Sequence, residues 1–398
     1  MSQNPPKYLP FAKPAIDDAA IAEMVACVQS GWLTTGPRVQ QFESMLSQYC
    51  GGNVTALALT YATAGLQLAL QALDLKDGDE VITTALTFVA TYNTIVQAGA
   101  KPVPVDIDRK TLNMDIGKIE SAITPRTRAI VPVHFAGLPV DLDPLYAIAK
   151  KHNLRVIEDC AHAIGTEYKG KKLGSFGDIQ VFSFHPNKNI TTGEGGAVIV
   201  RDTAVEKSIK TMRFHGIDRD AFNRFAKSGS LHYDVIAPGY KYNMMDIQAA
   251  LGIHQLPQLD GFIEKRRHLA DRYRKIFAAY PQLQIQCDPG FAHRHAWHLF
   301  CALIDPTIFG IDRDTFVTEM KSRDIGIGVH YPATHLYSYY QQQFGFKRGD
   351  FPNAEYVGDH IVSLPLFPAM TGSDQDRVID TMIDVLGIGK TNKKIAGA

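Results

Sequence analysis

Short apolar runs alternate with amphipathic stretches from Val54 to Val200. The runs have the length of buried strands, and most of the stretches between them carry apolar residues at helical spacing. We predict strands at residues 57–59, 80–83, 103–105, 129–132, 156–158, 180–183 and 197–200. Alternation of strands and helices predicts an α/β fold, with a mostly parallel, seven-stranded sheet that helices cover on both faces. In such folds, ligands bind at the carboxyl ends of the strands.

The remainder of the chain predicts further helices and a second, smaller domain. Helical spacing covers residues 17–30, and a long helical pattern rich in Leu, Ile, Lys and Arg runs from about 248 to 280. Beyond it, a strand at 299–304 and helices at 312–322 and 374–386 suffice for an α+β unit. We therefore predict a large domain at 1–250, a connecting helix at 251–280 and a small C-terminal domain at 281–398.

Composition narrows the classes of function. The 41 Lys and Arg residues balance 41 Asp and Glu residues, so the basic excess typical of a nucleic-acid-binding surface is missing. No apolar stretch approaches the roughly 18 residues that suggest a membrane span. The five cysteines have no CxxC spacing, and no HxH or HExxH spacing on one helix face supports a metal site. We expect a cytoplasmic enzyme that binds no nucleic acid, membrane or metal.

Two predicted strand ends carry the most informative residues. One ends in Glu-Asp-Cys-Ala-His at 158–162, and the other runs from Ser183 to Lys188 as Ser-Phe-His-Pro-Asn-Lys. Pyridoxal phosphate needs a lysine for the Schiff base and an acidic partner for its pyridine nitrogen. Lys188 and Asp159 could fill these roles. Each alone is more often a surface charge or a helix cap, so the prediction rests on their combination.

A phosphate site and an aromatic cover are predicted close to these strand ends. Ala62, Thr63 and the small residues after them open an apolar helix, whose free N–H groups could bind a phosphate. Ser183 could supply a second hydroxyl. Phe88 follows another strand end and could stack on the cofactor ring. The alternatives are that Ala62 and Thr63 belong to an ordinary helix cap, that Ser183 is structural and that Phe88 packs in the core.

Five ordered blocks make the sequence recognisable. They are Gly-Trp-Leu-Thr-Thr-Gly-Pro at 31–37, Gly-Asp-Glu-Val-Ile-Thr at 78–83, Glu-Asp-Cys-Ala-His at 158–162, Ser-Phe-His with Lys188, and Gly-Glu-Gly-Gly at 193–196. Together they resemble the DegT-type (DegT/DnrJ/StrS) nucleotide-sugar aminotransferases, which are pyridoxal-phosphate enzymes of fold type I. The resemblance spans nearly the whole chain.

The resemblance implies roles for individual residues. Lys188 would be the Schiff-base lysine, Asp159 would pair with the pyridinium, and His162 would lie near the phenolic oxygen. Phe88 would stack on the ring, and Ala62, Thr63 and Ser183 would hold the phosphate. It also implies a homodimer in which a loop at 239–243 completes the partner's site. Many members have Asn and Arg where this chain has Lys241 and Asn243, so either side chain could reach that phosphate.

The substrate is suggested by finer resemblance. Segments such as Leu-Pro-Phe at 9–11 and His-Ala-Trp-His-Leu-Phe at 295–300 are similar to the UDP-4-amino-4-deoxy-L-arabinose–oxoglutarate aminotransferases. Those enzymes transfer an amino group from L-glutamate to a UDP-4-keto-pentose in lipid A modification and release 2-oxoglutarate. Phe88, where that subgroup tends to have Trp, leaves open another UDP-, dTDP- or GDP-linked 4-keto-6-deoxyhexose.

His330, Tyr331 and His335 resemble a family segment at the substrate mouth, where imidazole and phenol groups can bond to the sugar or its diphosphate. Thr35 is predicted to contact the substrate as well. A histidine-rich surface loop is the alternative for His330, Tyr331 and His335. Two rival functions remain at this point. One is a sugar dehydratase, which typically has histidine in place of the lysine, and the other is a binding or regulatory protein of the same fold.

Overall fold

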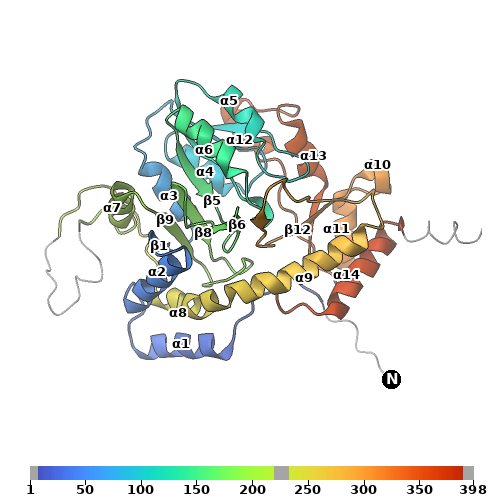
Figure 1. The fold of residues 1–398 in the computed structure, drawn as a ribbon, viewed down its shortest axis with the longest axis horizontal. Coiled ribbons are helices and arrows are strands. Elements are labelled where there is room, and N and C mark those ends of the chain that lie inside the picture. Colours follow the sequence, from blue (N-terminus) through green and yellow to red (C-terminus); the bar gives the residue numbers. More distant parts are fainter. Residues whose placement is uncertain (1–7, 219–232, 389–398) are drawn as a thin grey trace, which may run out of the picture.

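The computed structural model describes residues 8–218 and 233–388. Its largest sheet has seven strands in the order β1-β9-β8-β5-β4-β2-β3 (Figure 1). β9 is antiparallel to both neighbours, and the other neighbouring pairs are parallel. The strands are β1 (Thr55–Leu59), β2 (Glu80–Thr84), β3 (Lys101–Val105), β4 (Thr127–Val131), β5 (Arg155–Asp159), β8 (Ile179–Ser183) and β9 (Gly196–Val200). The predicted mostly parallel, seven-stranded sheet is confirmed.

Helices cover both faces of this sheet because successive strand residues point to opposite sides. In β1, Ala56 and Ala58 face one core and Leu57 and Leu59 face the other. The first core contains residues of α2 (Pro37–Tyr49), α6 (Leu142–Lys151), α8 (Asp246–Gln255) and α9 (Leu259–Phe277). The second contains residues of α3 (Ala62–Gln71), α4 (Ala90–Gln97) and α7 (Thr203–Met212). α1 (Asp18–Gln29) lies against α8, and α5 (Ile119–Ala122) precedes β4.

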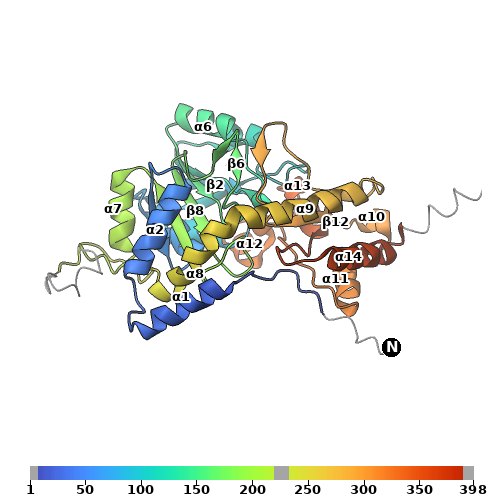
Figure 2. The same cartoon turned by 60° about the horizontal axis from the view of Figure 1, so that its bottom comes forward.

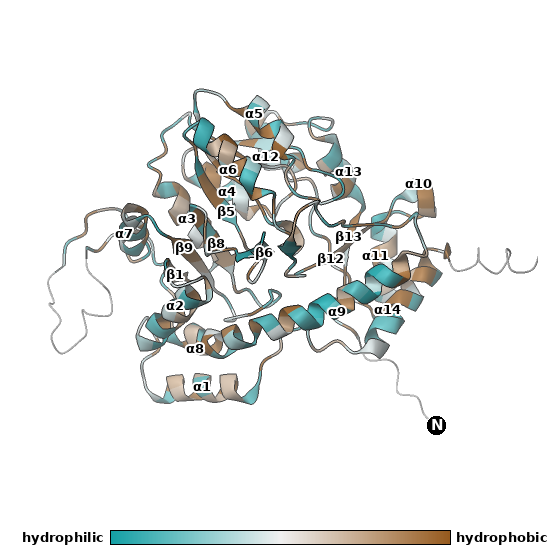
Figure 3. Ribbon diagram, viewed as in Figure 1, coloured by the Kyte–Doolittle hydropathy of each residue, from teal (hydrophilic) through white to brown (hydrophobic). Residues whose placement is uncertain are grey.

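The predicted helix at 248–280 is interrupted. A 3-10 turn, η4 (Leu256–Gln258), separates α8 from α9, and Pro257 lies within it. Proline lacks the N–H that a continuous helix would use, which explains the break. α9 then runs from the large sheet to the C-terminal part of the molecule (Figures 1 and 2). Hydrophilic and hydrophobic residues intermingle along it, as expected for a helix with one buried face (Figure 3).

The C-terminal part is built on a second, antiparallel sheet of β10 (Gln284–Ile285), β12 (Phe300–Leu303) and β13 (Ile361–Leu364). Its core contains residues of α9, α11 (Arg313–Ser322) and α14 (Gly372–Val385). Leu9 belongs to the same core and pairs with Ile325, so the start of the described chain lies in this part. The other helices here are α10 (Pro306–Phe309), α12 (Ser338–Phe344) and α13 (Pro352–His360).

The two parts of the molecule are joined by shared packing. A small sheet pairs β11 (His293–Arg294) with the hairpin of β6 (Glu167–Tyr168) and β7 (Lys171–Lys172). A further core brings Leu86 and Ile107 together with Leu299 and Val357. The exact domain boundaries at 250 and 280 stay predictions. Across the described ranges, no helix combines the length and apolar character needed to cross a membrane.

Candidate active site

A cavity of about 300 Å³ opens at the carboxyl ends of the sheet strands. The segments that follow β1, β2, β4, β5 and β8 all contribute to its lining. Nine of the predicted site residues line it: Ala62, Thr63, Phe88, Asp159, His162, Ser183, Lys188, His330 and Tyr331. The parallel direction of these strands therefore brings together residues from distant parts of the chain.

Lys188 lies in the turn after β8, where its backbone N–H bonds to the carbonyl of His185 at 2.9 Å. Its Nζ atom is 3.5 Å from Nε2 of His298. Burial lowers the pKa of the Lys188 amine to about 8, and the nearby Asp159 carboxylate opposes this shift. A large fraction of the amine is therefore neutral near pH 8. This is the state that can attack a carbonyl carbon.

Asp159 ends β5 with its carboxylate buried beneath the cavity. Oδ2 accepts a hydrogen bond from Thr91 Oγ1 at 2.9 Å, and Oδ1 accepts one from the N–H of Ala161 at 3.0 Å. Burial raises the pKa of Asp159, and these hydrogen bonds and the charge of Lys188 hold the rise in check. A buried carboxylate with two neutral donors is suited to pair with a further positive group.

His162 lies at the same end of the sheet and is held in one tautomer. Its Nδ1 accepts the N–H of Ala136 at 3.3 Å, and burial lowers its pKa, so the ring is neutral. The ring proton must then be on Nε2, which lies 3.1 Å from the hydroxyl of Tyr331. His162 therefore fixes Tyr331 at the wall of the cavity.

The first turn of α3 forms another wall. Tyr61 precedes the helix, and no side chain caps the free N–H groups of this turn. A Cβ atom at Gly196 would lie 2.5 Å from the nitrogen of Ala62, so only glycine lets β9 pass this close. The N–H groups of Ala62 and Thr63, with the Ser183 hydroxyl across the cavity, are thus available for an anion.

These groups fit pyridoxal phosphate. The lowered pKa of Lys188 suits bonding to its aldehyde, the buried carboxylate of Asp159 suits its protonated ring nitrogen, and the start of α3 suits its phosphate. The exposed ring of Phe88 lies 5.5 Å from that of Tyr331, in a position to cover the cofactor. The amine, the carboxylate and the helix N–H groups therefore match the aldehyde, the ring nitrogen and the phosphate of the cofactor.

Thr35, Lys241 and Asn243 lie elsewhere in the chain, outside this cavity. Lys241 Nζ donates to Asn243 Oδ1 at 2.6 Å, and the Asn243 amide donates to Thr35 Oγ1. Burial lowers the pKa of Lys241. Thr35 and Asn243 line a second cavity of about 530 Å³, together with Arg213. The structure thus groups these three predicted residues with one another, but not with Lys188.

His335 does not lie at the cavity, and its predicted contact with substrate needs correction. Its ring is fully buried, and Nε2 lies 3.0 Å from Oε1 of Glu355. The ring of Phe351 packs against it at 4.8 Å. Because η5 (Thr334–Leu336) directs the ring into this packing, His335 belongs to the interior and not to a surface loop.

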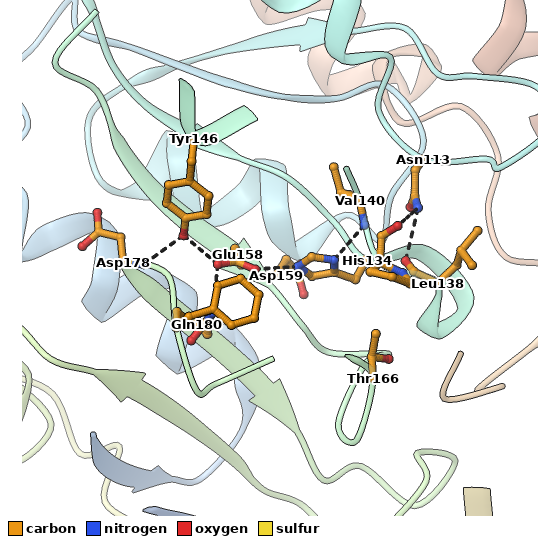
Figure 4. Close-up of polar contacts among 12 residues, drawn as sticks. Asn113, His134, Leu138, Val140, Tyr146, Glu158, Asp159, Thr166, Asp178 and Gln180 are labelled. Carbon is orange, nitrogen blue, oxygen red and sulfur yellow. Dashed lines mark hydrogen bonds and ion pairs between the residues drawn. The ribbon is translucent and has the colours of Figure 1, made fainter. Parts of the chain in front are cut away.

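His134, Glu158 and Cys160 place potential metal-ligand atoms within 4.8 Å of one another. Protein partners already engage the histidine and the carboxylate (Figure 4). Nε2 of His134 lies 2.9 Å from Glu158 Oε2, and its Nδ1 accepts the N–H of Val140. The other Glu158 oxygen accepts hydrogen bonds from Tyr146 and Gln180. This cluster is a buried hydrogen-bond network that ties β5 to the loop after β4.

The comparison with known proteins identifies the family. Residues 14–383 match the sequence profile of the DegT/DnrJ/EryC1/StrS aminotransferase family. The chain belongs to this family. Like its structural neighbours, this DegT-family protein is a pyridoxal-phosphate-dependent sugar aminotransferase. The predicted fold class, enzyme class and cofactor are confirmed, and the reading as a binding or regulatory protein is set aside.

Individual relatives of this DegT-family enzyme cover nearly its whole length. The spore coat polysaccharide biosynthesis protein SpsC of Bacillus subtilis is 44% identical over 390 residues, which are 97% of this chain and 99% of SpsC. PseC of Helicobacter pylori, an aminotransferase of pseudoaminic acid biosynthesis, has 30% identity and a TM-score of 0.88, over 96% of this chain and 100% of PseC. The PLP-form of a Streptococcus pneumoniae protein has 32% identity and a TM-score of 0.87, over 96% of this chain and 99% of that one.

The structure adds residues to this DegT-family site that the sequence analysis did not select. Thr91 contacts Asp159, Tyr61 precedes α3, and His298 contacts Lys188. Thr91 lies in the first turn of α4, four residues after Thr87, which precedes the helix. The hydroxyl oxygens of the two residues are 3.0 Å apart. That helical spacing was a signal that could have placed Thr91 beside Thr87. No spacing signal could have placed His298 beside Lys188, because the two residues are 110 positions apart in the sequence.

Proposed function

We propose that this aminotransferase transfers the amino group of L-glutamate to the keto carbon of a nucleotide-linked 4-keto-sugar. One observation carries the proposal: a lysine amine of lowered pKa, a buried carboxylate and an uncapped helix start share one cavity. Bound pyridoxal phosphate supplies an electron sink that stabilises negative charge on the substrate carbon. The protein must then position the groups that move protons.

Lys188 is the group that moves the proton in this proposal. Its neutral amine can take the proton from the amino-donor carbon and return it to the cofactor side, since its pKa lies near the working pH. Asp159 keeps the ring nitrogen protonated through its buried charge. His162 and Tyr331 hold the opposite wall through their 3.1 Å contact. These roles are supported by the cavity that all four side chains line together.

The sugar is proposed to enter at the mouth of the cavity, with its nucleotide outside. A volume of about 300 Å³ is at the lower end for ligand pockets and leaves little room beyond the cofactor and a sugar ring. Tyr61 at the mouth is 40% exposed and offers an aromatic face for a base, beside the Phe88 ring that covers the cofactor. His330 and Tyr331 line the cavity and can bond to sugar hydroxyls.

We infer two candidate sugars. The resemblance of segments such as 295–300 favours a UDP-4-keto-pentose, which would yield UDP-4-amino-4-deoxy-L-arabinose for lipid A modification. The similarity to PseC and SpsC, together with Phe88, favours a 4-keto-6-deoxyhexose linked to UDP, dTDP or GDP, for a surface polysaccharide. Both candidates present a keto group at the same ring position, so the same groups around Lys188 would serve either.

A substrate panel tests the proposal. Purified enzyme with pyridoxal phosphate and L-glutamate is offered UDP-4-keto-pentose and UDP-, dTDP- and GDP-linked 4-keto-6-deoxyhexoses. We expect 2-oxoglutarate release and an amino-sugar product with at least one of them, and none with a nucleotide-linked sugar that lacks the keto group. Turnover of glutamate only with ordinary 2-oxo acids, and with no member of the panel, would contradict the proposal.

We further propose that the active enzyme is a homodimer in which Lys241 and Asn243 complete the partner's site. These two side chains bond to each other away from their own Lys188 cavity. The segment before them exposes Val235 and Ile236, each 56% accessible, as expected for a surface that a second subunit covers. Either polar group could then reach a phosphate in the second subunit.

Subunit complementation tests this arrangement. Lys188→Ala and a Lys241→Ala/Asn243→Ala double variant should each be inactive or weakly active as pure dimers. Co-expressed at equal amounts, they should regain about one quarter of wild-type activity, because half of the dimers are mixed and each has one intact site. Size-exclusion chromatography with light scattering supplies the oligomeric state. A monomer with full activity, or mixed dimers without regain, would contradict the proposal.

A further inference from the structure

His298 is a buried residue beside the reacting amine for which the proposed reaction has no role so far. It lies between β11 and β12 and is 3% exposed. Its Nε2 atom is 3.5 Å from Lys188 Nζ, and its Nδ1 atom has no hydrogen-bond partner among the described residues. Burying this imidazole with Nδ1 unpaired costs stability, and the polar contact of its other nitrogen is with the amine of Lys188.

Hydrogen bonds hold the main chain of His298 in place. The N–H of His298 donates to the carbonyl of Ala136 at 2.9 Å, and its own carbonyl accepts a hydrogen bond from Arg266. Ala136 also donates its N–H to His162, whose ring lies 4.4 Å from that of His298. The two histidines are thus positioned by one residue of the loop after β4. These bonds fix the main chain of His298, and the ring itself packs against His162 beside Lys188.

The direction of the hydrogen bond follows from charge. Burial lowers the pKa of His298 well below its ordinary value, and the positive charge of Lys188 lowers it further, so the ring is neutral. An ammonium group can only donate, and a neutral amine can still donate an N–H. When Lys188 is charged, Nε2 of His298 must therefore accept from Nζ, and the ring proton is then on Nδ1. The neutral amine can keep this direction.

The other titratable groups that face Lys188 do not offer this acceptor. Asp159 interacts with Lys188 through its charge, and its oxygens accept from Thr91 and Ala161. His162 is engaged at both nitrogens, and His330 pairs through Nδ1 with Ser363 at 2.9 Å. His298 does not line the cavity itself, but it contacts the lysine nitrogen directly from behind.

We propose that His298 is a positioning residue for catalysis: its Nε2 holds one N–H of the free Lys188 amine, so that the nitrogen lone pair points into the cavity. This role rests on the proposed function, in which Lys188 leaves the cofactor and then moves a proton. No proton passes to His298. The proton travels between the substrate carbon and Lys188, while His298 limits the rotation of the amine.

Removal of the acceptor gives a signature that loss of packing does not give. The hydrogen bond favours the ammonium form, so its loss should lower the pKa of Lys188 further. A damaged, wetter site would instead raise this pKa toward its ordinary value, because solvation favours the charged form. The direction in which the pKa of Lys188 shifts therefore separates the positioning role of His298 from a merely structural one.

The test uses cofactor-free enzyme and 1-fluoro-2,4-dinitrobenzene, with mass spectrometry of the peptide that contains Lys188. The labelling rate is followed against pH for wild type, His298→Phe, His298→Gln and the control His295→Phe. His295 is a buried histidine of the same segment that stacks on Trp297 at 3.9 Å and is not among the groups facing Lys188. Gln retains an acceptor oxygen and serves as the conservative variant.

We expect the labelling midpoint of His298→Phe to fall by about one pH unit, with a plateau rate and a kcat about 10-fold to 100-fold lower. The KM for glutamate should change little. The labelling midpoint and the rates of His298→Gln should lie between those of His298→Phe and wild type, and His295→Phe should match wild type. A midpoint that stays or rises in both His298 variants, at unchanged melting temperature, would overturn the proposal. The labelling needs neither cofactor nor sugar. The role of His298 can therefore be tested even if the enzyme accepts no sugar of the panel.

Discussion

Thr91 donates a hydrogen bond of 2.9 Å from its hydroxyl to the buried Oδ2 of Asp159. This bond stabilises the charged carboxylate against the effect of burial, which raises its pKa. In the proposed function, Asp159 must remain charged to keep the ring nitrogen of pyridoxal phosphate protonated. Thr91 on α4 thereby helps to keep the Asp159 carboxylate at the end of β5 charged.

Thr91→Val should therefore move the acid limb of the kcat–pH profile to higher pH and lower kcat by about 10-fold at neutral pH. The sign follows because loss of a donor raises the pKa of Asp159 further, so the carboxylate is protonated at a higher pH. Thr94→Val is the matched control, since the Thr94 hydroxyl bonds to carbonyls of its own helix. An identical acid limb in both variants would refute this role for Thr91.

Asp159→Asn should keep the shape of the site and remove its charge. We expect cofactor to remain attached to Lys188 while kcat falls by about 100-fold or more, since a preorganised charge at the reacting group is lost. Steady-state kinetics and the visible spectrum of the purified variant supply the two readouts. A normal kcat for this variant would show that Asp159 does not hold the ring proton.

The residues at the strand ends could be predicted from sequence because local pattern and topology fix them. Buried parallel strands are apolar runs, and their carboxyl ends gather at one edge of the sheet. Predicted strands at 156–158 and 180–183 agree with β5 and β8, so Asp159 and Lys188 were placed correctly at this edge. Family resemblance then supplied the roles that pattern alone left open.

Side-chain placement across long sequence separations could not be predicted in this way. His335 lies in a polar segment, yet its ring turns inward to Glu355, and nothing in the local pattern reveals this. His298 approaches Lys188 because the loop that contains Ala136 holds its backbone. Such contacts depend on the packing of two parts of the fold, which periodicity does not describe.

His335→Ala should reduce stability and leave catalysis intact. Its removal leaves a space beside Phe351 and takes one hydrogen bond from the buried Glu355, which should cost about 1–3 kcal/mol in the free energy of unfolding. Urea unfolding and steady-state kinetics at a temperature where the variant is folded separate the two effects. A large loss of kcat without a change in unfolding would return His335 to the substrate site.

Glu158→Ala tests the buried network behind the site (Figure 4). It removes the shared partner of His134, Tyr146 and Gln180, so we expect a loss of about 3 kcal/mol or more in unfolding free energy. Glu120→Ala is the control, because its ion pair with Lys151 lies on the surface and should contribute nothing measurable. Equal stability of the two variants would contradict the structural role of the network.

Covalent attachment of the cofactor to Lys188 is the central claim, and borohydride reduction tests it most directly. Wild type and the exposed-lysine control Lys76→Ala are loaded with pyridoxal phosphate, reduced and digested, and the modified peptide is identified by mass spectrometry. Lys188→Ala is treated in the same way, and the visible absorbance is recorded before reduction. We predict one modified peptide containing Lys188 in the first two proteins, and neither modification nor a visible band in the third. Modification at another lysine, or an unchanged visible band in Lys188→Ala, would contradict the account.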